Sequence, residues 1–235
     1  MSFLFNNIIQ LILISNFVSN TLKSAITNLG NRQKIVNIFT LLAIPLFILG
    51  LVVSLIFATF LGNYRLHINP ISELGSILVT PYPFIMNGTF VLSSFFLSFY
   101  FFNLYKVVIK YSQYSKFYKN IANLGFLLIL IMIISLIFAG MITVDMSRGL
   151  HNLCTIFVFV PLIFGEFIIG VLILKLKIFK KYISILMAFG HLIVSLLYFF
   201  VHTPMLEWMM FVILLSWGMP LSFEIIKNNN YIQNP

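Results

Sequence analysis

Six polar side chains that suit acid–base or metal chemistry occur near corresponding ends of long apolar runs in this sequence. They are His67, Glu73, Asp145, His151, His202 and Glu207. Lipid excludes such groups, so several of them at one depth of a membrane protein indicate a functional site. Each residue taken alone is also explained as a helix cap, a partner of a helix dipole or a solvated interface residue. Their convergence is therefore the feature that indicates a site.

Metal-dependent hydrolysis of a lipid or amide is one reaction that these residue types suit. One carboxylate and two imidazoles bind zinc and leave a position open for water, so Asp145, His151 and His202 are candidate ligands of a divalent metal. Glu73 would then be the general base, with Ser72 as a supporting catalytic group. A different use of His151 and His202 is the ligation of haem b between two helices.

A non-enzymatic role as an accessory or lipid-interacting membrane protein is nevertheless the first expectation. The loops are short, cofactor motifs are absent, and Phe alone supplies 27 residues. The expected partners are membrane lipids and other membrane protein subunits. The metal-dependent hydrolase is the alternative, and the haem protein is a distant third. A transporter is disfavoured because the sequence shows no inverted repeat.

Two further polar residues lie inside apolar runs. Glu166 precedes Leu174, and His191 follows Tyr182, in each case by more than two helical turns. Both residues therefore lie roughly 12 to 14 Å from the same edge of two consecutive, antiparallel helices. An unpaired charge at that depth costs about 3 kcal/mol or more. We therefore predict that Glu166 faces the next helix and forms a buried polar pair with His191.

The elements that must position these residues are membrane-spanning helices. Of the 235 residues, 61% are hydrophobic and only 8% are charged, too few charges to cover a soluble domain. The apolar runs are long enough to cross about 30 Å of hydrocarbon, and they lack the alternation of membrane strands. We predict an all-α polytopic bundle of six spans, near Ile38–Phe60, Phe84–Tyr105, Ile121–Thr143, Leu150–Leu174, Tyr182–Phe200 and Met205–Ile226.

The segments around these spans complete the expected organisation. An amino-terminal interfacial segment (1–35) precedes the six-helix domain (36–227), and a polar tail (228–235) follows it. Within the first segment, Ser2–Ser19 is expected to lie in the interface, and a seventh span is the alternative. In the long loop after the first span, we predict a short helix near 69–75. Asn69 would cap this helix, Pro70 would open it and Gly75 would end it.

The distribution of Lys and Arg predicts the orientation of the bundle. Most of the 14 basic residues fall on one side of the six-span topology: Lys23, Arg32, Lys34, Lys106, Lys110, Lys116, Lys119, Lys175, Lys177, Lys180, Lys181 and Lys227. Basic loops stay in the cytoplasm, so both termini are expected there, in a protein of the cell membrane. The net charge of +9 is explained by these loops, and no segment is long enough to form a nucleic-acid-binding face.

A motif in the loop after the first span, together with several later residues, resembles the pattern of a known family. The stretch His67-Ile68-Asn69-Pro70-Ile71-Ser72-Glu73-Leu74-Gly75-Ser76 is followed by Pro83, Asn87-Gly88, Asp145 with His151, and Glu207-Trp208. This pattern resembles a prokaryotic membrane protein family catalogued as domain of unknown function nine-nine-eight. The resemblance covers about residues 36–226. It implies six spans and singles out Ser72, Glu73, Asp145 and His151, but it implies no activity.

Overall fold

The computed structural model describes residues 33–201 and 203–233, and these residues form helices and loops without a β-strand. Within them, six helices are long and apolar enough to cross a membrane: Gln33–Phe60, Pro83–Ser112 (α2), Lys116–Met141 (α3), Arg148–Leu176 (α4), Lys181–Val201, and Pro204–Asn228 in α7. The predicted all-α bundle of six spans is confirmed, and the chain is a multi-pass membrane protein. The compact helical unit begins at Phe39. The segment Ser2–Ser19 lies outside the described residues.

The fifth span is not one uniform helix. It consists of α5 (Lys181–Ile185), the π-helical turn η2 (Leu186–Gly190) and α6 (His191–Val201). Such π-helical turns are rare and often occur at functional positions. The apolar run predicted a single helix here because hydropathy carries no signal for the hydrogen-bond spacing inside a helix.

The last helix extends further than predicted. α7 runs from Pro204 to Gln233, so residues 228–233 of the expected polar tail are helical. The reason is that no Gly or Pro interrupts this segment before Pro235. Polarity marks the end of the apolar span, whereas the helix itself continues.

The predicted short helix in loop 61–82 is present, with different capping. It is a 3₁₀ helix, η1 (Ile71–Gly75), and Pro70 occupies its N-cap position without a side-chain cap. The predicted cap, Asn69, instead accepts a hydrogen bond from the backbone N–H of Arg65 at 2.8 Å and donates one to Glu73 at 2.7 Å. Asn69 therefore fixes the turn that leads into η1.

Small residues set how closely the helices approach each other. A Cβ at Gly165 of α4 would lie 3.1 Å from the carbonyl oxygen of Gly125 in α3. A Cβ at Gly170 would lie 2.6 Å from the backbone nitrogen of Ala188 in η2. Membrane helices gain van der Waals contact through such close approaches, because lipid provides no hydrophobic force between them.

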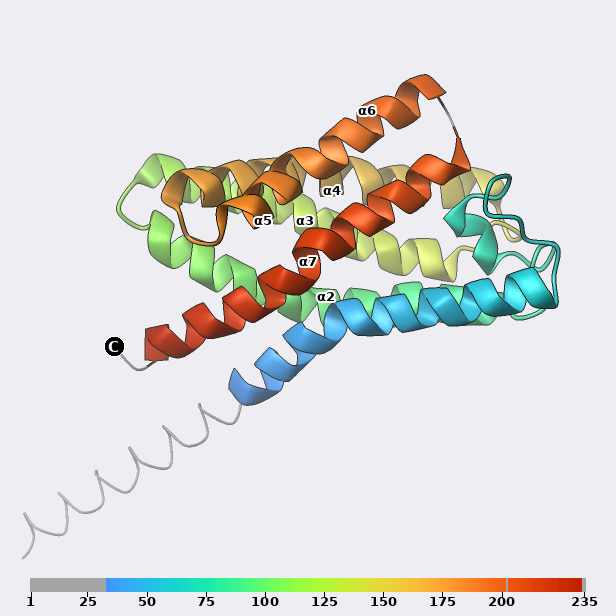
Figure 1. The fold of residues 1–235 in the computed structure, drawn as a ribbon, viewed down its shortest axis with the longest axis horizontal. Helices are drawn as coiled ribbons and strands as arrows, with labels where there is room; N and C mark the ends of the chain where they lie inside the picture. Colours follow the sequence, from blue (N-terminus) through green and yellow to red (C-terminus); the bar gives the residue numbers. More distant parts are fainter. Residues whose placement is uncertain (1–32, 202, 234–235) are drawn as a thin grey trace, which may run out of the picture. The chain divides into compact units, whose positions relative to one another are not determined.

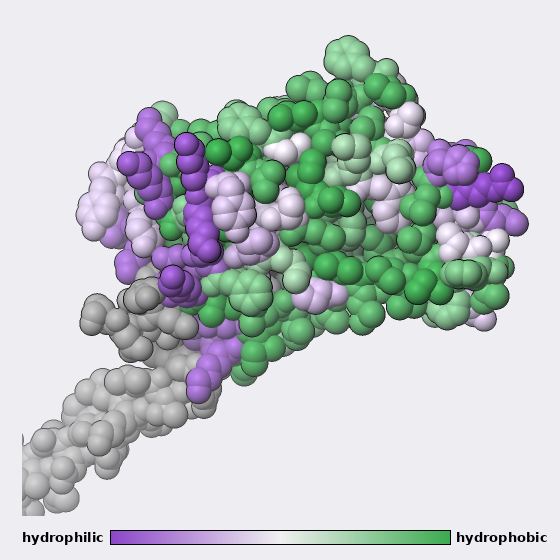
Figure 2. All heavy atoms as spheres, viewed as in Figure 1, coloured by the Kyte–Doolittle hydropathy of each residue, from purple (hydrophilic) through white to green (hydrophobic). Residues whose placement is uncertain are grey.

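The surface of the bundle matches a lipid environment. Figure 2 shows a hydrophobic belt over the transmembrane helices, with hydrophilic residues gathered at the two ends. Phe199, Phe200 and Phe84 are each more than two-thirds exposed. A soluble protein rarely exposes a continuous apolar surface of this extent. Loop 61–82 with η1, the α3–α4 turn and the α6–α7 junction lie at one end of the bundle (Figure 1).

Candidate functional site

Asp145 holds the C-terminal end of η1 against the turn between α3 and α4. One carboxylate oxygen accepts a hydrogen bond from the Ser76 hydroxyl at 2.7 Å, and the other accepts one from the Ile77 N–H at 2.8 Å. The side chain of Asn87 in α2 donates to the Gly75 carbonyl at 3.0 Å. These bonds satisfy backbone groups that the short helix leaves without partners. Asp145 thus acts as a structural clasp, in that its two hydrogen bonds fasten loop 61–82 to the α3–α4 turn.

Glu207 holds the other end of η1. It lies in the first turn of α7, and one carboxylate oxygen accepts from the Ile71 N–H at 3.0 Å. The second oxygen accepts from the Tyr198 hydroxyl of α6 at 3.2 Å. Two donors aimed at the two oxygens match the carboxylate form of Glu207. This one side chain therefore joins η1, α6 and α7.

Tyr64 supports η1 from beneath. Its side chain is buried, and its hydroxyl donates to the carbonyl oxygens of Asn69 at 2.9 Å and Pro70 at 3.2 Å. Burial raises the pKa of the Tyr64 hydroxyl, and the nearby Glu207 and Glu73 carboxylates raise it further. The hydroxyl therefore keeps its proton and remains a donor throughout the physiological range.

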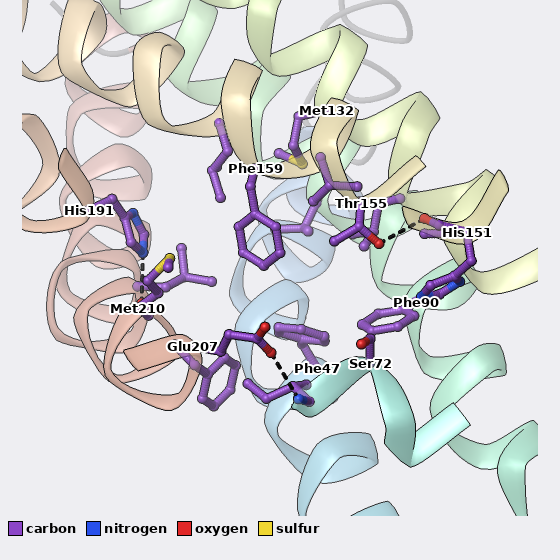
Figure 3. A pocket seen from close by; sticks show the side chains of 18 residues that line it. Phe47, Ser72, Phe90, Met132, His151, Thr155, Phe159, His191, Glu207 and Met210 are labelled. Carbon is purple, nitrogen blue, oxygen red and sulfur yellow. Dashed lines mark hydrogen bonds between the residues drawn. The ribbon is translucent and has the colours of Figure 1, made fainter. Parts of the chain in front are cut away.

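A cavity of about 130 Å³ lies beneath η1, inside the bundle. Most of its lining is apolar and comes from the first helix, α2, α3, α4 and α7. Five polar side chains also line it: Ser72, His151, Thr155, His191 and Glu207. Figure 3 shows Ser72 of η1, His151 of α4 and Glu207 of α7 reaching the cavity from three different elements. An apolar chamber with a few convergent polar groups is the usual form of a small-molecule site.

His151 lines this cavity and has one buried ring nitrogen without a partner among the described residues. The residue is 2% exposed, and its Nδ1 lies 2.7 Å from the Ile142 carbonyl oxygen, which can only accept. Nδ1 therefore carries a hydrogen. Nε2 is buried and has no hydrogen-bond partner among the described residues. Thr155, one turn further along α4, donates its hydroxyl hydrogen to the His151 carbonyl at 2.9 Å.

The structure brings Glu166 and His191 together within the membrane span. His191 Nδ1 is hydrogen-bonded to a Glu166 carboxyl oxygen, and His191 Nε2 lies 2.7 Å from the Met210 carbonyl oxygen. Nε2 must donate to that carbonyl, so one further proton is shared between Nδ1 and the carboxyl. The pair has no net charge wherever that proton lies, which suits a site with side chains 0% and 3% exposed.

The close approach of α4 and η2 explains why this pair can form. Gly170 follows Glu166 by one helical turn on the same face of α4, and it touches the backbone of Ala188. His191 lies one turn after Ala188 on the facing element. The Gly170–Ala188 contact therefore sets the spacing at which the Glu166 carboxyl meets the imidazole.

The remaining predicted site residues are separated. Ser72 lines the cavity, whereas Glu73 is hydrogen-bonded to Asn69 and His67 lies exposed on the loop. Among the described residues, no group of three His, Cys, Asp or Glu side chains could hold a metal ion. His202, which both the metal and the haem hypotheses require, lies outside those residues, so neither hypothesis is tested. Asp145 is already bonded to Ser76 and Ile77.

Several contributors to the site carry no sequence signal strong enough to identify them. Tyr64, Ser76, Tyr198 and Thr155 are ordinary residues for a loop or a helix end. Asn87 is the exception, because an amide one turn inside an apolar span is an anomaly that predicts a hydrogen-bonded role. The cavity itself is a product of packing and has no counterpart in the sequence.

Comparison with models of protein families, with curated proteins and with solved structures finds no match to this chain. The resemblance of residues 36–226 to the membrane family named above therefore stays a prediction.

Proposed function

We propose that this protein is a lipid-interacting membrane protein that takes an amphiphile into the cavity beneath η1. The observation that carries the proposal is the combination of an apolar chamber with three polar side chains at η1, α4 and α7. A void of about 150 Å³ in a protein core binds a molecule the size of benzene. A cavity of about 130 Å³ therefore encloses the head and the first few carbons of an amphiphile.

The surrounding elements suit this role. Ile71 and Ser72 of η1 line the cavity, and this five-residue helix is held by side-chain hydrogen bonds at both ends. Loops held by a few hydrogen bonds open at lower cost than packed helices. We further propose that the η1 end faces out of the cell and that both termini lie in the cytoplasm, which is the orientation supported by the distribution of Lys and Arg.

The test uses tryptophan fluorescence of the protein in lipid nanodiscs. The chain has two tryptophans, and Trp217 lies in edge contact with the cavity residue His191, with ring centroids 6.5 Å apart. Bromohexane, a bromoalkane of suitable size, should quench this fluorescence in a saturable manner. Ala139→Phe should abolish the saturable component, because the added ring fills the cavity at a buried lining residue.

Leu127→Phe is the matched control. Leu127 lies on the same helix, α3, but is 53% exposed toward lipid, so the substitution adds a ring without filling the cavity. This variant should quench like the wild type. Equal saturable quenching in folded Ala139→Phe protein, or non-saturable quenching in the wild type, would overturn the proposal.

A further inference from the structure

The polar groups of the cavity differ in what they can still offer to a ligand. Both imidazole nitrogens of His191 are engaged within the protein. The Thr155 hydroxyl has donated its hydrogen to the His151 carbonyl, so only its oxygen remains available, as an acceptor. Ser72 can both donate and accept. The ligand's head must match the groups that remain.

His151 offers an acceptor. Its Nδ1 hydrogen is directed at the Ile142 carbonyl, and it is bonded to no carboxylate among the described residues. Nε2 of the neutral ring is an acceptor, and it is the buried atom without a partner. A hydrogen-bond donor that reaches this nitrogen would satisfy it, and a carboxylate has no hydrogen to donate.

Glu207 adds further acceptor capacity. Each of its carboxylate oxygens accepts one bond from the protein, and each keeps a lone pair for a second bond. Among the residues that the structure describes, no Lys or Arg lines the cavity. An anionic head would therefore meet a carboxylate and find no cation to neutralise it.

We infer that the cavity selects amphiphiles with a neutral or cationic head that donates hydrogen bonds, namely alcohols, amides or amines. Carboxylates and phosphodiesters, which have no hydrogen to donate at neutral pH, are rejected. The head lies among Ser72, His151 and Glu207, and the hydrocarbon lies against the apolar wall (Figure 3). This inference rests on the function proposed above and specifies the ligand of that same site.

The experiment compares three brominated probes of equal chain length in wild-type nanodiscs: bromohexanol, bromohexylamine and bromohexanoate. Bromohexane serves as the reference without a head group. The alcohol and the amine should quench tryptophan with an affinity about tenfold higher than bromohexane, the gain expected of one buried hydrogen bond. Bromohexanoate should bind at least tenfold more weakly than the alcohol.

Variants identify the residues that cause the preference for one head group over another. Ser72→Ala and His151→Phe should each reduce the ratio of the affinity for the alcohol to the affinity for bromohexane. His67→Phe, a histidine substitution on the exposed part of the same loop, should not change this ratio. The wild-type probe series keeps the test decisive if His151→Phe fails to fold.

The outcomes separate this inference from the proposed function. Equal affinity for all three heads, or tightest binding of bromohexanoate, would overturn the head-group inference and leave cavity binding intact. Absence of saturable quenching by every probe would overturn both. Selection of the alcohol that persists in both Ser72→Ala and His151→Phe would place the head group elsewhere and overturn the inference.

Discussion

The buried pair of Glu166 and His191 allows the sharpest mutational prediction. Glu166→Met and His191→Phe each keep the approximate size of the side chain and remove one partner. Glu166→Met leaves His191 Nδ1 without its hydrogen-bond partner, and His191→Phe leaves the Glu166 carboxyl group without its partner. An unsatisfied buried polar group costs about 1 to 3 kcal/mol, so each single variant should be destabilised by that amount.

The double variant should be less destabilised than the sum of the single variants. It removes both polar groups, including a second Glu166 oxygen that is buried without a hydrogen-bond partner among the described residues. Hydrogen bonds between membrane helices have coupling energies of about 0.6 kcal/mol on average and about 1.7 kcal/mol at most. We expect a value near that maximum, about 1.5 kcal/mol, because both side chains are almost completely buried.

The assay is reversible unfolding in mixed detergent micelles, followed by helical circular dichroism, for the wild type, both single variants and the double variant. Phe164→Leu on the lipid-facing side of α4 is the control and should change stability by less than about 0.5 kcal/mol. Additive effects of the two substitutions, with a coupling energy near zero, would refute the argument that the pair acts as one hydrogen-bonded unit.

Three further predictions concern the framework of the site. Gly170→Val should destabilise the fold by more than about 2 kcal/mol in the same unfolding assay, because its Cβ would lie 2.6 Å from the Ala188 nitrogen. Gly88→Val is the control, since its Cβ meets no atom within 4 Å, and equal stability of the two variants would contradict the close packing of Gly170. Asp145→Ala should raise the rate of amide hydrogen exchange at residues 76–82 by about tenfold, which corresponds to the loss of more than 1 kcal/mol of local stability. Unchanged exchange would show that Asp145 does not hold this segment in place. The free energy of unfolding should fall as the pH rises above about 10, because the Tyr64 pKa is raised in the folded state and the unfolded chain releases that proton first. Tyr64→Phe should lose less stability over this alkaline range, and an identical loss would exclude Tyr64 as its source.

Much of the fold was predictable because lipid imposes simple rules. Apolar runs of sufficient length must be helices, and this placed the six spans. The Glu166–His191 contact followed from depth alone, because two polar residues on adjacent antiparallel helices must satisfy each other. The hydrogen bond between them adds what depth could not supply, namely that the two helix faces are turned toward each other.

At the η1 end of the bundle, the sequence predicted which residues gather there but not which contacts they make. Sequence position gives the depth of Asp145, His151 and Glu207, whereas their partners depend on how each helix is rotated about its axis. Glu207 binds the backbone N–H of Ile71 in η1, and Asp145 binds that of Ile77 just after η1; the sequence does not reveal which N–H groups need such partners. Of the residues chosen for chemistry, Ser72, His151 and Glu207 line the cavity together.

The central claim is that an amphiphile binds beneath η1 with its head at His151. Crystals grown in a lipidic phase and soaked with bromohexanol would test it through the anomalous signal of bromine. We predict a bromine peak against the apolar wall near Leu97, Met132 and Leu162, with connected density ending at His151 Nε2. Bromine peaks confined to the lipid-facing surface, with none inside the bundle, would contradict the claim.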